Sequence, residues 1–287
     1  VSSNADGSQT FLFFDNAQYF ADIGFATLKG KMWQKPEIFG SELNSKAFEG
    51  GACISLDGNT IVFTSNRKEG SMGGSDLYLI KKENNGSWSN PVNLGANINT
   101  TYDEEAPALS LDGNELYFSS KGWNSMGGFD IFRSVFDRQS NTWGKPENIG
   151  FPINTTEDNS FISFTGDGRS MYMAAIRPEG YGQRDIYKVS FLNTSSRSIY
   201  TVINGNVIST NGGKVELTRV SLVDKENKTL LEIKPPYQTN HFVLIAKPGN
   251  YTIRAEGYHF EPLHEPIEIS SDNTAVIEKN ISVTLSK

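Results

Sequence analysis

Residues 110–131, SLDGNELYFSSKGWNSMGGFDI, decide the fold, because the same pattern stands at residues 55–77 and, more loosely, at residues 165–186. Trp33, Trp88 and Trp143 are spaced 55 residues apart, and Pro36, Pro91 and Pro146 follow them at one fixed offset. Asp-Gly and Asp-apolar pairs mark the same cycle: Asp6-Gly7, Asp57-Gly58, Asp112-Gly113, Asp167-Gly168, Asp22-Ile23, Asp76-Leu77, Asp130-Ile131 and Asp185-Ile186. A repeat of this length, made of strand-like segments and turns, predicts β-propeller blades.

The third repeat shows how one blade is expected to be built. Residues 106–110 read as a short apolar strand, Asp112-Gly113 as a tight turn, and residues 115–120 as an aromatic-rich strand. After a glycine-rich loop, residues 130–136 alternate as a half-buried strand does, and Trp143 opens the last strand. The fourth repeat has no closing Trp and the first lacks a full inner strand, so blade number and ring closure stay open.

The pattern changes after Phe191. Residues 193–198 read as a polar linker, and short strands separated by polar turns follow. We expect these strands near residues 199–208, 214–223, 229–233, 240–246, 250–256, 265–269 and 275–285. Regular short strands of this kind predict a small β-sandwich. The predicted fold class is therefore all-β, with a propeller over residues 1–192, a linker over 193–198 and a sandwich over 199–287.

Charge and composition exclude several classes of function. Residues 1–192 carry 16 Lys and Arg against 23 Asp and Glu, a net charge of −7, whereas residues 193–287 are neutral. Because phosphate backbones bind basic patches, nucleic acid is not an expected partner. The single cysteine, Cys53, rules out an internal disulfide, and no apolar run reaches the length of a membrane span. The chain opens on Val1 without a signal peptide, so we expect a mature or excised piece of a longer protein.

Two family resemblances rest on these motifs. Over about residues 2–191, the unit Ser-x-Asp-Gly, aromatic strand, Gly-Gly-x-Asp-Ile-Tyr resembles the TolB-type, WD-like propeller repeat of bacterial envelope proteins. Over about residues 199–285, Gly205-Asn206-Val207, residues 220–224, residues 248–251 and Glu256-Gly257-Tyr258 resemble the carboxypeptidase-regulatory, transthyretin-like sandwich. Modules of that second kind usually act as spacers or interaction domains.

The combination resembles envelope proteins of the Bacteroidetes, among them a component of the type IX secretion system. There, tetratricopeptide repeats may precede the propeller, and an OmpA-type peptidoglycan-binding domain often follows the sandwich. The resemblance implies a non-enzymatic, periplasmic and outer-membrane-associated scaffold that docks envelope or secretion-system proteins. Peptidoglycan would be bound only through a domain that these residues do not contain. No cofactor and no metal ion are expected.

Candidate partner-binding residues lie in the long loops between the second and third strands of the repeats. Interfaces are enriched in aromatic residues, Met and Arg, so the following residues form a candidate loop rim: Arg67, Met72, Lys121, Trp123, Met126 and Arg177. The alternative is that each loop packs on its own blade.

Acidic residues before the innermost strands suggest a second candidate region. The following residues are expected to line a channel mouth: Glu49, Glu104, Glu105 and Asp158. Paired carboxylates could serve a carbohydrate-binding or carbohydrate-cleaving propeller, and the alternative is a solvated acidic rim. The recurring Asp22, Asp76, Asp130 and Asp185 are expected to be structural, accepting N–H groups of the preceding loop, and the three tryptophans are expected between blades.

Other chemistry finds little support in the sequence. No Gly-x-Ser-x-Gly elbow exists, and His241, His259 and His264 all lie in the second segment, so the propeller cannot hold a Ser-His-Asp triad. Cys53 stands in an apolar strand, where core packing is expected. His259 and His264 lack a third zinc ligand, and the Asp-Gly pairs and residues 103–105 lack a calcium-loop pattern, so both are read as turns.

Overall fold

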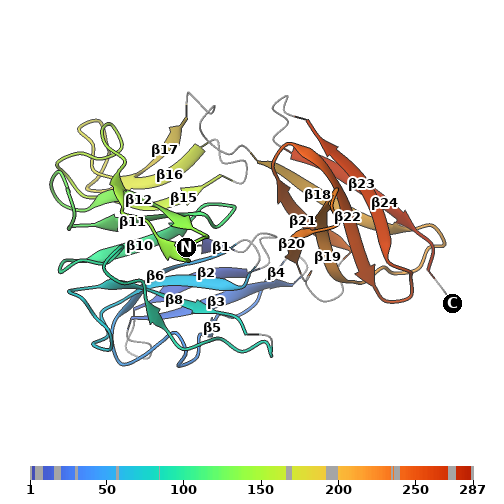
Figure 1. Ribbon diagram of the computed structural model, residues 1–287, viewed down its shortest axis with the longest axis horizontal. Helices are drawn as coiled ribbons and strands as arrows, with labels where there is room; N and C mark the ends of the chain where they lie inside the picture. The colour runs from blue at the N-terminus through green and yellow to red at the C-terminus, as the bar shows by residue number, and fades with distance from the viewer. Residues whose placement is uncertain are drawn as a thin grey trace. The chain divides into compact units, whose positions relative to one another are not determined.

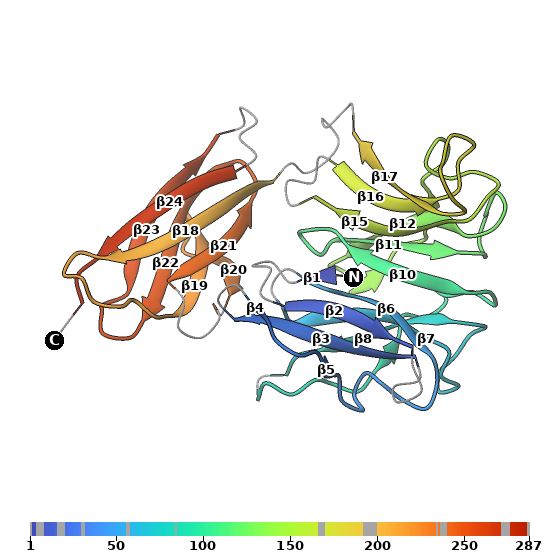
Figure 2. The same ribbon diagram turned by 180° about the vertical axis from the view of Figure 1, so that it is seen from behind.

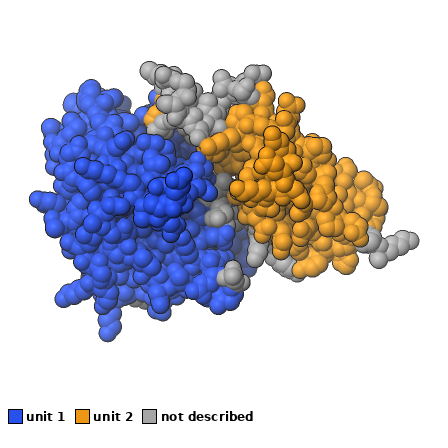
Figure 3. Space-filling model, viewed as in Figure 1, with its two compact units in different colours: residues 1–4, 9–165, 170–190 blue, residues 5–8, 166–169, 191–287 orange. Residues whose placement is uncertain are grey.

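The computed structural model describes residues 2–3, 9–15, 21–29, 32–55, 58–83, 85–165, 170–191, 200–233, 235, 240–270 and 276–285. The predicted turns Asp6-Gly7 and Asp167-Gly168, the residue Asp57 and the predicted linker 193–198 lie outside these residues. The chain divides into two compact units, coloured in Figure 3. All regular structure in the described residues is β, and none of them forms a helix long and apolar enough to cross a membrane.

The first unit consists of four antiparallel sheets, each built from strands that follow one another in the chain. Blade 1 contains β1 (Ser2–Ser3), β2 (Gln9–Phe14), β3 (Asp22–Lys29), β4 (Met32–Trp33) and β5 (Glu37–Ile38). Blade 2 contains β6 (Glu49–Ile54), β7 (Thr60–Ser65), β8 (Asp76–Lys81) and β9 (Val92–Asn93). Blade 3 contains β10 (Glu104–Leu109), β11 (Glu115–Ser120), β12 (Asp130–Asp137), β13 (Thr142–Trp143) and β14 (Glu147–Asn148). Blade 4 contains β15 (Asn159–Phe164), β16 (Ser170–Ala175) and β17 (Asp185–Ser190).

The blades follow one another in chain order, with blade 1 and blade 4 at opposite ends of the series (Figures 1 and 2). Successive blades pack face to face through apolar side chains of alternating strand positions. Val62 and Leu77 of blade 2 meet Leu116 and Phe118 of blade 3 in one buried cluster. The prediction of an all-β fold with propeller blades is confirmed.

The first serine of the Ser-x-Asp-Gly motif closes the hairpin turn by accepting a backbone N–H from the start of the next strand. The Ser110 hydroxyl accepts the Glu115 N–H at 2.9 Å, and Gly113 adopts a φ of 66°, which glycine tolerates without strain. Ser55 accepts the Thr60 N–H in the same way at 3.0 Å. The motif therefore sets the turn between the two innermost strands of a blade.

The recurring tryptophans do not share one environment. Trp143 is buried against Phe136 at a ring distance of 5.1 Å, and Trp88 is half-buried against Phe39 at 6.0 Å. Trp33 is exposed. The expectation of packing between blades therefore fails for Trp33, which stands on the two-residue strand β4.

The second unit has seven described strands, close to those expected from the sequence. They are β18 (Thr201–Ser209), β19 (Leu217–Asp224), β20 (Thr229–Ile233), β21 (His241–Ala246), β22 (Gly249–Gly257), β23 (Leu263–Ile269) and β24 (Val276–Val283). One sheet has the order β21-β18-β24 and the other β20-β19-β22-β23, with β18 and β24 parallel. Gly205 is required because a Cβ there would stand 1.9 Å from the Phe242 ring. The resemblance of this unit to the carboxypeptidase-regulatory sandwich stays a prediction.

Candidate functional site

Three asparagines at equivalent positions bind the loop that leads into the innermost strand of one blade to the third strand of the blade before it. Asn99 accepts the Leu77 N–H at 2.9 Å and donates to the Leu77 carbonyl at 3.0 Å. Asn44 binds Ile23, and Asn154 binds Ile131, through the same pair of hydrogen bonds. These clamp asparagines (Asn44, Asn99 and Asn154) are buried, so they satisfy backbone groups that water cannot reach.

Two aspartates add a second link between neighbouring blades. Asp103 accepts the Ser75 N–H at 3.0 Å, and Asp158 accepts the Phe129 N–H at 2.9 Å. We call Asp103 and Asp158 the hook aspartates. A Cβ at Gly74 would lie 2.2 Å from Oδ1 of Asp103, so only glycine allows this hydrogen bond to form. Gly128 stands in the same relation to Asp158, with 2.1 Å, which explains why the Gly-Gly pair recurs.

The Asp that opens each third strand fixes the tip of the loop before it. Asp76 accepts the Met72 N–H at 2.6 Å, Asp130 accepts the Met126 N–H at 2.5 Å, and Asp185 accepts the Tyr181 N–H at 2.7 Å. The structural role expected for the recurring aspartates is thereby confirmed in blades 2, 3 and 4. The corresponding loop of blade 1 lies outside the described residues.

The side chains at these tips point outward. Met72, Met126 and Tyr181 are all exposed, although their backbone N–H groups are bound by the blade. We call these three residues the loop-tip row. A large apolar side chain on a fixed backbone therefore recurs once in each of blades 2, 3 and 4.

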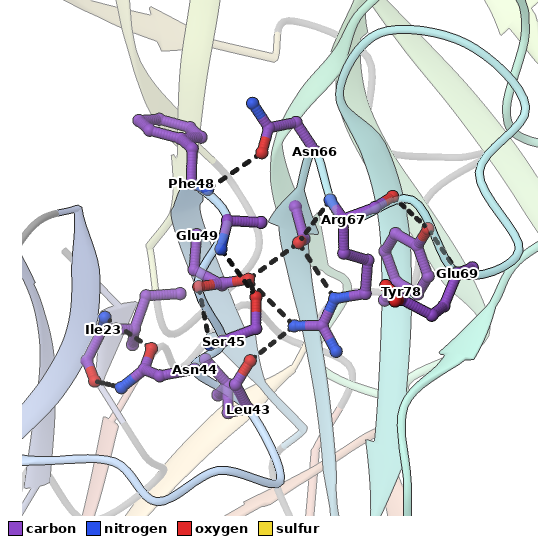
Figure 4. A network of polar contacts seen from close by, with 12 residues as sticks. Ile23, Leu43, Asn44, Ser45, Phe48, Glu49, Asn66, Arg67, Glu69 and Tyr78 are labelled. Atoms are coloured by element: carbon purple, nitrogen blue, oxygen red, sulfur yellow. Dashed lines mark hydrogen bonds and ion pairs between the residues drawn. The ribbon is translucent and has the colours of Figure 1, made fainter.

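Glu49 and Arg67 form a buried ion pair inside blade 2 instead of facing solvent (Figure 4). The Arg67 guanidinium donates to Glu49 at 3.0 Å and to the Leu43 carbonyl at 2.6 Å. The Glu49 carboxylate also accepts hydrogen bonds from Ser45 and Ser65. The expectation that Glu49 lines a channel mouth and Arg67 a loop rim is wrong, because both side chains are buried and hydrogen-bonded to each other inside the blade.

Glu104 occupies the same position in blade 3 without an arginine partner. It accepts the Thr100 N–H and hydroxyl and the Ser120 hydroxyl, each at 2.7 Å, and it has no exposed surface. Gly122 stands where blade 2 has Arg67. Burial, and to a lesser extent the charge of Asp76, raises the pKa of Glu104 in spite of these hydrogen bonds. The expected place of Glu104 at a channel mouth is also wrong.

Arg177 and Trp123, two further loop-rim candidates, pack on the blades and hydrogen-bond to them. Arg177, half-buried, donates to the Ile153 carbonyl at 2.7 Å and to the Thr155 hydroxyl at 3.0 Å. Trp123 is half-buried in the cluster between blades 2 and 3, and its indole N–H donates to the Ile98 carbonyl at 3.1 Å. For these two side chains the alternative reading, a loop packed on the blades, describes the geometry.

A charged cluster gathers the remaining candidates on blades 3 and 4. It consists of Asp103, Glu105, Lys121, Asp158 and Arg184. Lys121 pairs with Asp103 at 2.8 Å, and Arg184 pairs with Asp158 at 2.6 Å. Burial, then Asp103, raises the pKa of Glu105, whereas the Phe129 N–H and Arg184 lower the pKa of Asp158. The structure thus brings Lys121, which the sequence had assigned to the loop rim, together with Glu105 and Asp158, which it had assigned to the channel mouth.

No described residues form a group of three or more His, Cys, Asp or Glu side chains that could hold a metal ion. Cys53 is buried between blades 2 and 3, and burial raises the pKa of its thiol to about 12. A thiol held protonated in this way is not a nucleophile at neutral pH.

Sequence reasoning missed Tyr181 and the clamp asparagines. Tyr181 could have been found by adding one repeat of 55 residues to Met126. Asn44, Asn99 and Asn154 also recur at intervals of 55, but an Asn in a loop reads as turn chemistry until its partners are seen.

Comparison with known proteins gives no family for this chain. No protein-family model matches it, and no curated protein does. Among solved structures it is similar to TolB from Acinetobacter baumannii, with 15% identity, a TM-score of 0.40, and coverage of 84% of this chain and 54% of that one.

Two enzymes are similar to a comparable degree. Prolyl oligopeptidase B from Galerina marginata has 9% identity and a TM-score of 0.37, over 95% of this chain and 32% of that one. GH43B of the Bacteroides ovatus xyloglucan PUL has 12% identity and a TM-score of 0.35, over 96% of this chain and 56% of that one. The chain therefore spans about half of TolB and GH43B and a third of the oligopeptidase. Because these TM-scores are low, the propeller assignment rests on the four consecutive antiparallel sheets of the first unit.

Proposed function

We propose that the first unit is a non-enzymatic docking module, and that the loop-tip row is the surface that contacts its partner. The observation that carries this proposal is the repeated display of Met72, Met126 and Tyr181 on loops pinned by Asp76, Asp130 and Asp185. Met and aromatic side chains are enriched at protein interfaces.

The pinned backbones favour binding for an energetic reason. A loop that is already ordered loses less conformational entropy when a partner covers it, so more of the contact energy appears as affinity. The Met72 and Met126 loops are ordered further by the hook aspartates, which bind Ser75 and Phe129 just beyond the Gly-Gly pairs. Lys121 and Arg184 of the charged cluster stand close in sequence to Met126 and Tyr181, and their charges could select a partner.

The cellular setting belongs to the proposal as well. We place the protein in the periplasm, associated with the outer membrane, with envelope or secretion-system proteins as partners. Support comes from the sequence resemblance to TolB-type repeats joined to a regulatory-like sandwich, which is an analogy of architecture. Fractionation of cells that carry a tagged chain tests this placement, because recovery in the cytosol would contradict it.

The docking surface is tested by affinity capture from mildly cross-linked envelopes, read by mass spectrometry. The test variant carries Met72→Ser, Met126→Ser and Tyr181→Ser together. A matched control carries Val92→Ser and Val135→Ser, two exposed apolar residues on β9 and β12 outside the loops. We expect the wild-type chain and the control to recover the same envelope proteins and the loop-tip variant to lose them. Equal recovery by all three proteins would contradict the proposal.

A carbohydrate-cleaving propeller is the second candidate, and the charged cluster favours it. Glu105 and Asp158 are partly exposed, and their surroundings shift their pKa values in opposite directions, as in acid–base carboxylate pairs. Glu104 cannot contact a sugar because it is sealed in the blade. Hydrolysis of a panel of aryl glycosides that is lost in Glu105→Gln would establish this function, and the absence of hydrolysis would favour docking.

A further inference from the structure

Blade 4 exposes a face that is buried in the other blades. Ile186 is 81% exposed, whereas its equivalents Ile131 and Leu77 are fully buried. Tyr172 is 43% exposed, and its equivalent Tyr117 only 2%. Phe161, on the innermost strand β15, is exposed on the same blade. We call Phe161, Tyr172 and Ile186 the open face of blade 4.

The internal repeat shows what covers an equivalent face. On blade 3, blade 4 covers Tyr117, and the Phe164 ring lies 4.8 Å from the Tyr117 ring. The covering blade also donates a backbone N–H across the junction, from Asn159 to the Phe129 carbonyl at 2.6 Å. The open face repeats the Tyr and Ile of the covered face at the same register, so it fits another blade-type sheet.

The two kinds of junction in the molecule narrow the identity of that sheet. Where a hook aspartate reaches across, the receiving loop has glycine at the contact, as in Gly74 with Asp103 and Gly128 with Asp158. Between blades 1 and 2 the hook position is Phe48 instead, and it packs on Phe13 at a ring distance of 5.7 Å. The Glu49 N–H still donates across this junction, to the Ala21 carbonyl at 2.9 Å. A junction without a hook is thus stable in this fold.

The loop of blade 4 that would face a following blade is built for a junction that has no hook aspartate. Its residue equivalent to Gly74 and Gly128 is Gln183, whose side chain would occupy the place of a hook carboxylate. The next residue, Arg184, already pairs with Asp158. An incoming blade with an aspartate at the hook position would therefore collide with Gln183.

A second copy of the chain is a poor fit for the open face of blade 4. The end of the series that it would present is blade 1, which has Gly24 where blades 2 and 3 have Tyr78 and Phe132. The Phe14 ring lies over that glycine, 2.7 Å from where a Cβ would stand. Blade 1 thus lacks the large side chain that a covering blade supplies at this position.

We propose that the open face of blade 4 docks a further blade-type sheet that has no aspartate at its hook position and comes from polypeptide other than residues 1–287. Its apolar face covers Phe161, Tyr172 and Ile186, and its first strand donates a backbone N–H near Arg184. The open face contains none of the three loop-tip residues, and a different experiment tests it, so either proposal can fail alone.

The experiment supplies such a blade as a probe. A copy of residues 40–95, which contain blade 2 with its Phe48, is joined ahead of Val1 through a flexible linker. A matched fusion carries Phe48→Asp in the copy only. Hydrogen exchange of β17 amides is compared with that of the parent chain, whose sedimentation is also measured.

We expect the unaltered copy to slow exchange in β17 by about tenfold or more, because the face becomes covered. The Phe48→Asp fusion should exchange like the parent, and Gln183→Gly in that fusion should restore the slowing. Slowing by both fusions alike would overturn the role of Gln183. If no fusion slows exchange, or if the parent chain dimerises and protects β17 by itself, the proposed occupant is wrong.

Discussion

Two sets of residues recur with the blade period, and they differ in where their side chains end. Glu49 and Glu104 open the innermost strands and are completely enclosed, with hydroxyl and backbone donors around each carboxylate. The loop-tip row recurs with the same regularity and is exposed. Recurrence alone therefore does not separate structural residues from binding residues, whereas the direction of the side chain does.

The enclosed position differs in charge from one blade to the next. Blade 2 neutralises Glu49 with Arg67, blade 3 leaves Glu104 without a cation, and blade 4 has the neutral Asn159 at this position. All three side chains accept hydrogen bonds from the residue four positions earlier. The fold thus requires an acceptor here, and the charge on that acceptor is variable.

The largest effect is expected when the buried ion pair loses its cation. Arg67→Met leaves the Glu49 carboxylate buried and unpaired, which should cost about 3–5 kcal/mol of unfolding free energy. Urea denaturation at neutral pH measures this loss. Arg177→Met in blade 4 is the control, because Asn159 carries no charge, and about 1 kcal/mol is expected there for lost hydrogen bonds. Equal losses in the two variants would show that the charge of Glu49 is not the reason.

A smaller effect is expected where glycine permits two blades to approach. Gly127→Ala places a Cβ 2.2 Å from the Thr156 carbonyl oxygen of the following blade. Overpacking of this kind should destabilise the protein by about 1–3 kcal/mol. Gly182→Ala changes the same loop position in blade 4, where the nearest atom is 3.8 Å away, and should have little effect. Thermal unfolding of both variants measures the two changes in stability. A large loss of stability in Gly182→Ala would refute the explanation by contact between blades.

The pH dependence of stability isolates Glu104. Its pKa in the folded protein is raised above the unfolded value near 4.5, so protonation stabilises the fold. That stabilisation is complete at pH values below about 4.5 and is lost as the pH rises through the folded-state pKa. Glu104→Gln should therefore gain stability relative to the wild type as the pH rises above about 4.5 towards neutral. Melting temperatures of the two proteins that change in parallel over this range would contradict the account.

The smallest effect on stability is expected in the loop-tip row. Tyr181→Ala removes an exposed side chain, so the free energy of unfolding should change by less than about 0.5 kcal/mol. Tyr117→Ala, on the buried face of blade 3, should cost about 3–5 kcal/mol. A measured loss above 1 kcal/mol for Tyr181→Ala, by the criterion for surface sites, would mean that the row packs on the protein itself.

The sequence predicted the blades because their signals are local. Asp112-Gly113 sets a hairpin, and residues 115–120 supply an apolar strand, whatever lies next to them. It did not predict that Glu104 is sealed, because its burial depends on Ser120 of the neighbouring strand and on the way the preceding loop folds Thr100 back onto the carboxylate. The exposure of Met72 and Met126 was predictable because loop tips between strands lie at the surface. Arg67 was misplaced because an arginine in a loop gives no local sign of a buried partner.

The most direct test of the docking proposal is photo-cross-linking in living cells from single loop-tip positions. A benzoyl-phenylalanine replaces Tyr181 or Met126 in turn, and the same residue replaces the exposed Val135 as a control. The account predicts one discrete adduct with the same envelope protein from both loop-tip positions and none from the control. Absence of any adduct at the loop tips, or an identical adduct from Val135, would contradict it.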